Sequence, residues 1–420
     1  MKNTSTFQII LMGVFIFFIV AGVIVFATYK SGNQTITDKV QIWGTIDHNT
    51  IDKLLSKLGE TDQSVKNISY KQINVENFNF QFTEAMAEGN GPDAIILQQD
   101  SIFQQKNKIL TIPYDSYSER DFKNQFIEEG ELYLSNEGVI GLPFIVDPMV
   151  MYWNRDIFSK AGVAIPPKSW DEFFALSQKI TEKDDNLNIL KSFVSFGEFR
   201  NITHAKELLS SLIIQADDKI VSNETVSFGK DGSAEEAVDF FVQFSNPVKP
   251  VYSWNRSLPE SQKMFISGNL AVYFGFASEL NNLRVKNPNL NFDVATMPKT
   301  SKSGNVFGKM YSLAITKNSK NPGVVFSAIK ILTGDEALKI LSDFNGLPPV
   351  SRTLLSSKPS NPYQVVFYDS AILTKAWGDP SSPETNLIFQ NMIESIISGR
   401  QKTKQAIDKA SSEIQTLLQK

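Results

Sequence analysis

The longest apolar stretch of the chain lies near its N-terminus, from Ile9 to Ala27, and contains no charged residue. An α-helix of this length spans roughly 28 Å, close to the hydrocarbon core of a membrane. A cleaved signal peptide has a shorter apolar core, of about 7–15 residues, so a cleaved signal is the less favoured alternative. We therefore expect a cytoplasmic tail over 1–8, a transmembrane anchor over 9–28 and a polar linker over 29–37, with the body of the protein outside.

After the linker, short apolar runs alternate with apolar residues at helical spacing. The spacing of Ile51, Leu54, Leu55 and Leu58 predicts an amphipathic helix. Strands are predicted on both sides of it and after the next helical segment. This strand–helix–strand order predicts a parallel α/β lobe. The expected strands are 40–43, 68–75 and the buried run 94–97, and a helix over 82–87 is expected to end at Gly89.

Further elements are predicted by helix-capping patterns. Ser169-Trp170-Asp171-Glu172 is a capping-box pattern that precedes a helix with Phe173, Phe174 and Ile180 on one side. Asn321-Pro322 is an N-cap followed by proline at the first helical position. The remaining expectations are a strand over 149–153 and helices over 234–244, 324–332 and 403–418.

Composition excludes several classes of protein. The chain has 41 Lys+Arg and 45 Asp+Glu, a net charge of −4, which gives no electrostatic case for binding nucleic acid. Cysteine is absent, which excludes disulfides, thiolate metal sites, a cysteine nucleophile and a lipid-modified cysteine. With two histidines, no three-histidine metal site can form, so we predict neither a metal nor a cofactor.

Six sequence segments, in order, carry a resemblance to a known family. The most specific is 141–158, GLPFIVDPMVMYWNRDIF, and PPKSWDE follows it at 166–172. The others are AEGNGPDA (87–94), YSWN (252–255), FISGNLA (265–271) and GLPPVSR (346–352). Together they resemble the extracellular solute-binding proteins of ABC importers, in the maltose-binding-protein-like group that binds sugars and oligosaccharides.

The resemblance implies a two-lobed periplasmic-binding-protein-like (type II) α/β fold with discontinuous lobes. It assigns 38–146 and 299–345 to lobe 1, and 147–298 and 346–420 to lobe 2. It also implies a solute captured in the cleft by hinge closure and delivered to the permease subunits of an ABC importer. A transmembrane helix in place of a lipid anchor is a departure from the usual pattern.

Candidate ligand-binding residues follow strand-like runs or lie in polar loops, where sugars find polar partners and aromatic faces. Asp147 stands in an apolar stretch, where a carboxylate needs a partner. His48 is expected on the surface, and Tyr152, Trp153 and Trp170 in the core. The expected contacts are Trp43, Asp47, Asp100, Asp147, Trp254, Phe276, Glu279, Tyr311, Arg352 and Trp377, with Arg352 able instead to latch the lobes.

Two other functions compete with solute capture for import. An enzyme could use paired carboxylates on glycosides, but no pattern identifies an acid and a nucleophile, and the phosphate-loop, HExxH and GxSxG motifs are absent. A sensor or adhesion module could keep the fold without transport. Among ligands, carbohydrate is favoured over polyamine, phosphate-ester, peptide and metal. We therefore expect a non-enzymatic receptor for a small solute.

Overall fold

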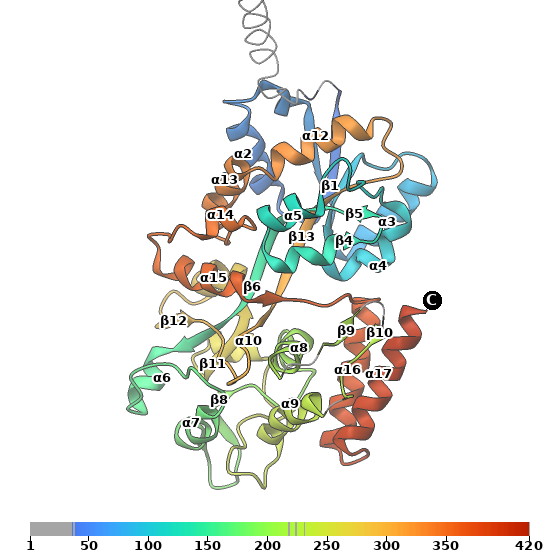
Figure 1. Ribbon diagram of the computed structural model, residues 1–420. Helices are drawn as coiled ribbons and strands as arrows, with labels where there is room; N and C mark the ends of the chain where they lie inside the picture. The colour runs from blue at the N-terminus through green and yellow to red at the C-terminus, as the bar shows by residue number, and fades with distance from the viewer. Residues whose placement is uncertain (1–35, 37, 217–218, 223–224, 231, 420) are drawn as a thin grey trace, which may run out of the picture.

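One sheet of ten strands runs through both halves of the molecule (Figure 1). The computed structural model describes residues 36, 38–216, 219–222, 225–230 and 232–419. The main path of the sheet is β2-β1-β3-β13-β6-β11-β8-β7, and β12 and β14 pair with β6 and β13. The predicted anchor over 9–28 lies outside the described residues. Of the helices in the described ranges, none is long and apolar enough to cross a membrane.

The upper half in Figure 1 is built on three parallel strands, as the sequence predicts. These are β1 (Val40–Gly44), β2 (Ile68–Gln72) and β3 (Ala94–Gln98), connected by α2 (His48–Leu58) and α3 (Val75–Ala87). The strand predicted over 68–75 ends early because the Asn74 side chain accepts from the Glu76 N–H and starts a helix. The four apolar residues of β3 that precede Gln98 are buried, as expected.

Three strands of the sheet, β6, β13 and β14, join the two halves. β6 (Leu142–Asn154) is buried along its whole length, and its residues up to Pro148 pair with β13 (Val306–Ile315). From Met149 onward β6 pairs instead with β11 (Leu270–Phe276) and β12 (Phe292–Ala295). The third segment is β14 (Thr374–Lys375), which pairs with β13. Pairing partners therefore change between Pro148 and Met149, in the middle of one strand.

The lower half packs helices around β11 and β8 (Ile189–Val194) (Figure 1). The Glu172 carboxylate accepts from the Ser169 N–H, one arm of the predicted capping box, and the last helix has the predicted bounds. The elements here are β7 (Glu182–Lys183), α6 (Arg155–Lys160), α7 (Glu172–Ile180), α8 (Ala205–Gln215), α9 (Ser233–Val242), α10 (Ser261–Ile266), α11 (Leu280–Lys286), α16 (Ser382–Ile397) and α17 (Thr403–Leu418).

The remaining elements cover the upper half or connect the halves. They are α4 (Ile102–Gln105), α5 (Glu119–Gln125), the 3-10 helix η4 (Glu128–Tyr133), β4 (Leu134–Ser135), β5 (Gly138–Val139), α12 (Pro322–Leu332), α13 (Asp335–Asn345), α14 (Arg352–Leu355) and α15 (Pro362–Ile372), with the hairpin β9 (Val221–Ser222) and β10 (Thr225–Val226) in the lower half. Short 3-10 turns lie at 63–67, 99–101, 106–108, 243–245 and 277–279.

The predicted lobe boundaries stay a prediction, but one segment lies on the other side of its boundary. α14 falls in 346–420, which was assigned to lobe 2. In the structure it packs on α5 and α13, both within the ranges assigned to lobe 1. The chain therefore returns to the lower half after α14, since contacts made by α15 are with β6 and β12.

Candidate functional site

A cavity of about 390 Å³ lies between the two halves and is lined by both. Its upper wall comes from the loop after β1, from α3 and from the segment after β3. Its lower wall comes from the first turn of α8 and the first turns of α16. The lining side chains are mostly polar: Thr45, Val75, Phe78, Asn79, Ile96, Leu97, Gln98, Asp100, Ser101 and Gln104 above, and Lys206, Glu207, Ser382, Pro383 and Asn386 below.

A buried ion pair lies at the lower wall. Lys206 Nζ is 2.8 Å from Asp379 Oδ2, and each side chain is 4% exposed. Lys206 also donates to Ser382 Oγ (2.9 Å), and Thr385 Oγ1 donates to both oxygens of Asp379. Burial raises the pKa of Asp100 at the upper wall, and the Lys206 charge partly offsets that rise. The wall thus holds one satisfied ion pair and a further carboxyl group.

A second group of polar side chains lies along β6, β11 and β13, outside the lining of the cavity. The Ser278 N–H donates to Asp147 Oδ1 (3.0 Å), and Lys309 Nζ lies 4.1 Å from the centre of the Phe276 ring. Burial raises the pKa of Asp147, opposed by Ser278 and Lys309. Burial also raises the pKa of Tyr311, and the charges of Asp147 and Asp100 raise it further.

Glu279 is held by several partners at the edge of this group. His204 Nε2 lies 2.7 Å from Glu279 Oε1, which also accepts from the Phe276 N–H (2.8 Å), and Tyr273 Oη donates to Oε2 (2.6 Å). Burial, the largest influence, raises the pKa of Glu279, but these contacts outweigh it and lower the pKa below its ordinary 4.5.

The pKa of Glu279 predicts a stability effect that depends on pH. A carboxylate with a depressed folded-state pKa stabilises the fold above its unfolded-state pKa, and that stabilisation is lost as pH falls through the folded-state value. Glu279→Gln should therefore cost about 1–3 kcal/mol at pH 7. Urea unfolding should show this difference from the parent protein shrinking below pH 4.5. Glu384→Gln, on the exposed first turn of α16, is the control. If Glu279→Gln lost the same stability below pH 4.5 as at pH 7, the result would contradict the assignment.

The structure places one predicted site residue in the lining of the cavity between the halves, gathers four along β6, β11 and β13, and leaves five elsewhere. Asp100 lines the cavity, whereas Asp147, Phe276, Glu279 and Tyr311 are buried or half-buried along these strands, outside the lining. Whether they contact a ligand stays a prediction. The other five are Trp43, Asp47, Trp254, Arg352 and Trp377.

Trp254 is a correction, because its ring is fully buried. The polar loop around it led us to expect an exposed ring, but the indole N–H donates to Asn201 Oδ1 (3.1 Å) and the ring packs in the core of the lower half. Trp43 is also buried, with Lys71 Nζ 4.2 Å from its ring centre. Asp47 caps α2 by accepting from the Thr50 N–H.

Arg352 and Trp377 have structural partners. Arg352 Nε donates to the backbone oxygens of Lys123 and Phe126, which fixes α14 on the end of α5 rather than latching the two halves. The Trp377 ring is 4% exposed, and its Nε1–H donates to Ser210 Oγ (3.2 Å). It lies behind the Lys206 ammonium group, with Nζ 5.9 Å from its centre.

Sequence reasoning missed Lys206, Asp379, His204 and Lys309. One signal was present: Asp379 lies between glycine and proline, whereas Lys206 stands beside Glu207 at the start of α8, an ordinary place for a charged residue. The expected core residues Tyr152, Trp153 and Trp170 are buried, and His48 is on the surface beside Asp52, as expected. No cluster of three metal-ligating side chains occurs within the described ranges.

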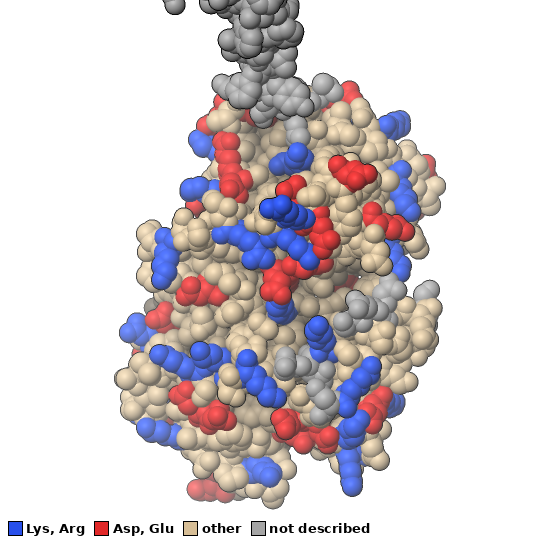
Figure 2. Space-filling view, in the orientation of Figure 1, with Lys and Arg blue, Asp and Glu red and all other residues tan. Residues whose placement is uncertain are grey.

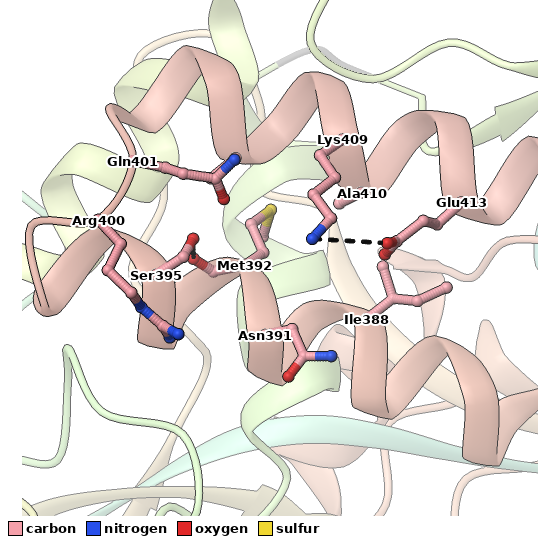
Figure 3. A pocket seen from close by; sticks show the side chains of 10 residues that line it. Ile388, Asn391, Met392, Ser395, Arg400, Gln401, Lys409, Ala410 and Glu413 are labelled. Atoms are coloured by element: carbon pink, nitrogen blue, oxygen red, sulfur yellow. Dashed lines mark hydrogen bonds and ion pairs between the residues drawn. The ribbon is translucent and has the colours of Figure 1, made fainter.

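A second cavity of about 390 Å³ lies between α16 and α17 (Figure 3). It belongs to one helical hairpin of the lower half. Lys409 and Glu413, one turn apart on α17, pair along one wall of it, with Nζ and Oε1 3.8 Å apart. Figure 2 shows basic and acidic side chains interspersed over the visible face. The two cavities have equal volumes. Of the two, only the cavity between the halves is lined by both halves, so only its shape could change when the halves rotate.

The sequence model of the family described as bacterial extracellular solute-binding protein matches residues 60–339, more than half of the chain. The chain belongs to this family. Its members bind solutes and are not enzymes, which confirms the expected absence of enzymatic activity. The family resemblance stated from the sequence is also confirmed, and the family is one of extracellular proteins.

Curated relatives and solved structures agree with the family. A putative binding protein of Brucella abortus is 22% identical, covering 81% of this chain and 83% of its own. The maltotriose-binding protein of Pyrococcus abyssi is 23% identical, covering 74% and 67%. The cyclic alpha-maltosyl-1,6-maltose binding protein of Arthrobacter globiformis superposes with a TM-score of 0.76 at 15% identity, covering 90% and 98%.

A further solved structure carries a ligand that is not an oligosaccharide. UgpB of Mycobacterium tuberculosis in complex with glycerophosphocholine superposes with a TM-score of 0.71 at 15% identity, covering 91% of this chain and 99% of that one. At such identities the likeness establishes the two-lobed α/β fold, and that part of the fold prediction is confirmed.

Proposed function

We propose that the solute-binding body captures a sugar or oligosaccharide in the cavity between its two halves and delivers it to an ABC importer. The observation that carries this proposal is a cavity with mostly polar walls contributed by both halves. Hydroxyl, amide and carboxyl groups match the donors and acceptors of a sugar, and Phe78 in the lining offers apolar ring surface.

Closure gives this arrangement a means of signalling that ligand is bound. Asp100 and Gln98 belong to the upper wall, whereas Lys206 and Asn386 belong to the lower wall. A ligand that contacts both walls binds the closed state more tightly, and it shifts the population toward that state by this difference in affinity. An importer that docks only on the closed form then receives loaded receptor.

The membrane part of the proposal rests on sequence alone. The apolar run from Ile9 to Ala27 would hold the body outside the cell as a single-pass anchor, in reach of permease subunits. A sensor or adhesion module of the same fold is the alternative. Ligand binding without any uptake in cells that carry the protein would favour this alternative over import.

The ligand class can be tested by thermal unfolding against mono- and oligosaccharides, with polyamines, glycerophosphodiesters and amino acids as controls. A ligand that binds only the folded state stabilises it by about 2.7 kcal/mol at a hundred times its Kd. We expect a shift that is selective for sugars. Its absence across the sugars, with a shift by another class, would overturn carbohydrate as the ligand.

Site variants locate the binding cavity once a sugar is found. Asp100→Asn and Asp147→Asn should each weaken binding by about ten- to a hundredfold, the value of a hydrogen bond to a charged group. Isothermal titration calorimetry measures the change. Asp52→Asn, on the outer face of α2 beside His48, is the matched control and should bind as the parent does. Equal affinity in all three variants would place the ligand elsewhere.

A further inference from the structure

Glu129 is a buried carboxyl group without a hydrogen-bond partner among the described residues. The residue is 3% exposed, and neither of its carboxyl oxygens is accessible to solvent. The hydroxyl of neighbouring Thr374 donates to the Ala371 carbonyl oxygen (2.7 Å) instead. A buried polar group in this state is costly, so such a group needs an explanation.

The position of Glu129 is where the three connecting segments meet. A Cβ atom at Gly308 of β13 would lie 2.9 Å from Glu129 Oε2 and 2.5 Å from Thr374 Cγ2 of β14. Gly308 is the residue of β13 that pairs with Pro148 of β6. The carboxyl group therefore lies against β13 and β14 at the level where β6 changes its pairing partners between the two halves.

The charged groups around Glu129 are mostly engaged with other partners. Burial raises the pKa of Glu129 to about 7, and the nearby Thr374 hydroxyl and, more weakly, the charge of Lys375 on β14 oppose that rise. The neighbouring groups and their partners are Glu128 with Lys375, Glu131 with Lys123 of α5, Tyr133 Oη with the Leu97 and Met310 carbonyl oxygens, Lys309 with the Phe276 ring, and Asp147 with the Ser278 N–H. None of these contacts neutralises Glu129 itself.

We propose that Glu129 links lobe closure to proton binding, being neutral while η4, β13 and β14 are packed together and ionised when the halves rotate apart and water reaches it. The proposal rests on the proposed function only in assuming that the halves move as they do in two-lobed binding proteins. It assigns a regulatory role to a residue outside the ligand cavity.

The direction of the effect follows from the two conformations. If the open state has the ordinary pKa of 4.5 and the packed state a pKa of about 7, protonation favours the packed state. The advantage of the packed state is fully present below pH 4.5 and is lost progressively as pH rises toward 7. Between pH 6 and pH 8 the ratio of packed to open molecules should fall about tenfold.

The absence of cysteine makes the test direct, because two labels can be placed without background. Asn77→Cys on α3 and Glu384→Cys on α16 put spin labels at exposed positions on the two sides of the cavity. Pulsed electron paramagnetic resonance then gives the distribution of distances at pH 6 and pH 8, with no ligand added. We expect the short-distance population to be larger at pH 6.

Two variants decide whether Glu129 is responsible. Glu129→Gln mimics the neutral form and should keep the pH 6 distribution at both pH values. Glu128→Gln, whose carboxylate pairs with Lys375, should shift with pH as the parent does. A parent distribution that is the same at both pH values, or a shift that persists in Glu129→Gln, would overturn the proposal.

The remaining outcomes are also decisive. If Glu129→Gln does not fold, Glu128→Gln and the parent decide the matter. A pH shift in the parent that is lost in Glu128→Gln overturns the assignment to Glu129, and a pH shift that is kept in both supports it. No sugar is needed for the measurement. A failed sugar panel would therefore remove the proposed ligand class and leave this result unaffected.

Discussion

Replacing Lys206 with methionine is expected to destabilise the folded protein by about 3–5 kcal/mol, because it leaves the buried Asp379 carboxylate without its counter-ion. Both side chains are 4% exposed, and their atoms are 2.8 Å apart. Urea unfolding monitored by circular dichroism measures the change.

Two controls separate loss of the ion pair from loss of packing. Lys206→Met combined with Asp379→Asn removes both charges and should recover more than half of the lost stability, since no uncompensated charge then remains. Lys339→Met breaks the pair with Asp343 on α13, where both partners are exposed, and should leave the unfolding midpoint unchanged. A similar loss from Lys206→Met and Lys339→Met would show that burial of the first pair has no energetic consequence.

Replacing Trp170 with alanine is expected to cost about 3–5 kcal/mol, the usual effect of removing a large aromatic side chain from a core. The ring is 6% exposed and packs against Phe173, Phe196 and Phe274, with centroids 5.0–6.0 Å away. Unfolding of the lower half, followed by tryptophan fluorescence and hydrogen exchange, should report the loss.

The indole N–H of Trp170 can be tested separately from its ring. It donates to Gln215 Oε1 (2.7 Å), and Gln215 Nε2 donates to the Pro298 carbonyl oxygen. Trp170→Phe keeps most of the ring but leaves the buried Gln215 oxygen unpaired, which should cost about 1–3 kcal/mol. Phe80→Ala, at a ring that is 71% exposed, is the control. Little difference between Trp170→Phe and the parent would mean that the hydrogen bond is dispensable.

The sequence was informative where local interactions decide the structure. The predicted bounds of the last helix, 403–418, match α17, because its apolar residues repeat at helical spacing. The helix after Asn321-Pro322 begins at Pro322, since proline lacks only an N–H that the first turn cannot use. Where a side chain competes with the strand, as Asn74 does, the predicted boundary was late by a few residues.

The candidate site was predicted less well, because the burial and the ion pairing of its residues depend on packing between segments that are distant in the chain. Trp254 stands in a polar loop, yet Asn201 and the surrounding core bury it completely. Lys206 and Asp379 are 173 positions apart, so neither could be recognised as half of an ion pair. Asp100, Asp147 and Glu279 were selected because each follows or interrupts an apolar strand-like run, and whether any of them contacts a ligand stays a prediction.

By itself the sequence determined the α/β class, the order of most elements and, through its ordered motifs, the solute-binding family. Each of these depends on neighbours within a few positions or on short motifs that can be read in a single chain. Only the tertiary structure decided which side chains line the cavity, which tryptophans are buried, and that Glu129 lies where β6, β13 and β14 meet. These depend on segments that are far apart in the chain, and local patterns carry no information about which distant surfaces will cover a side chain.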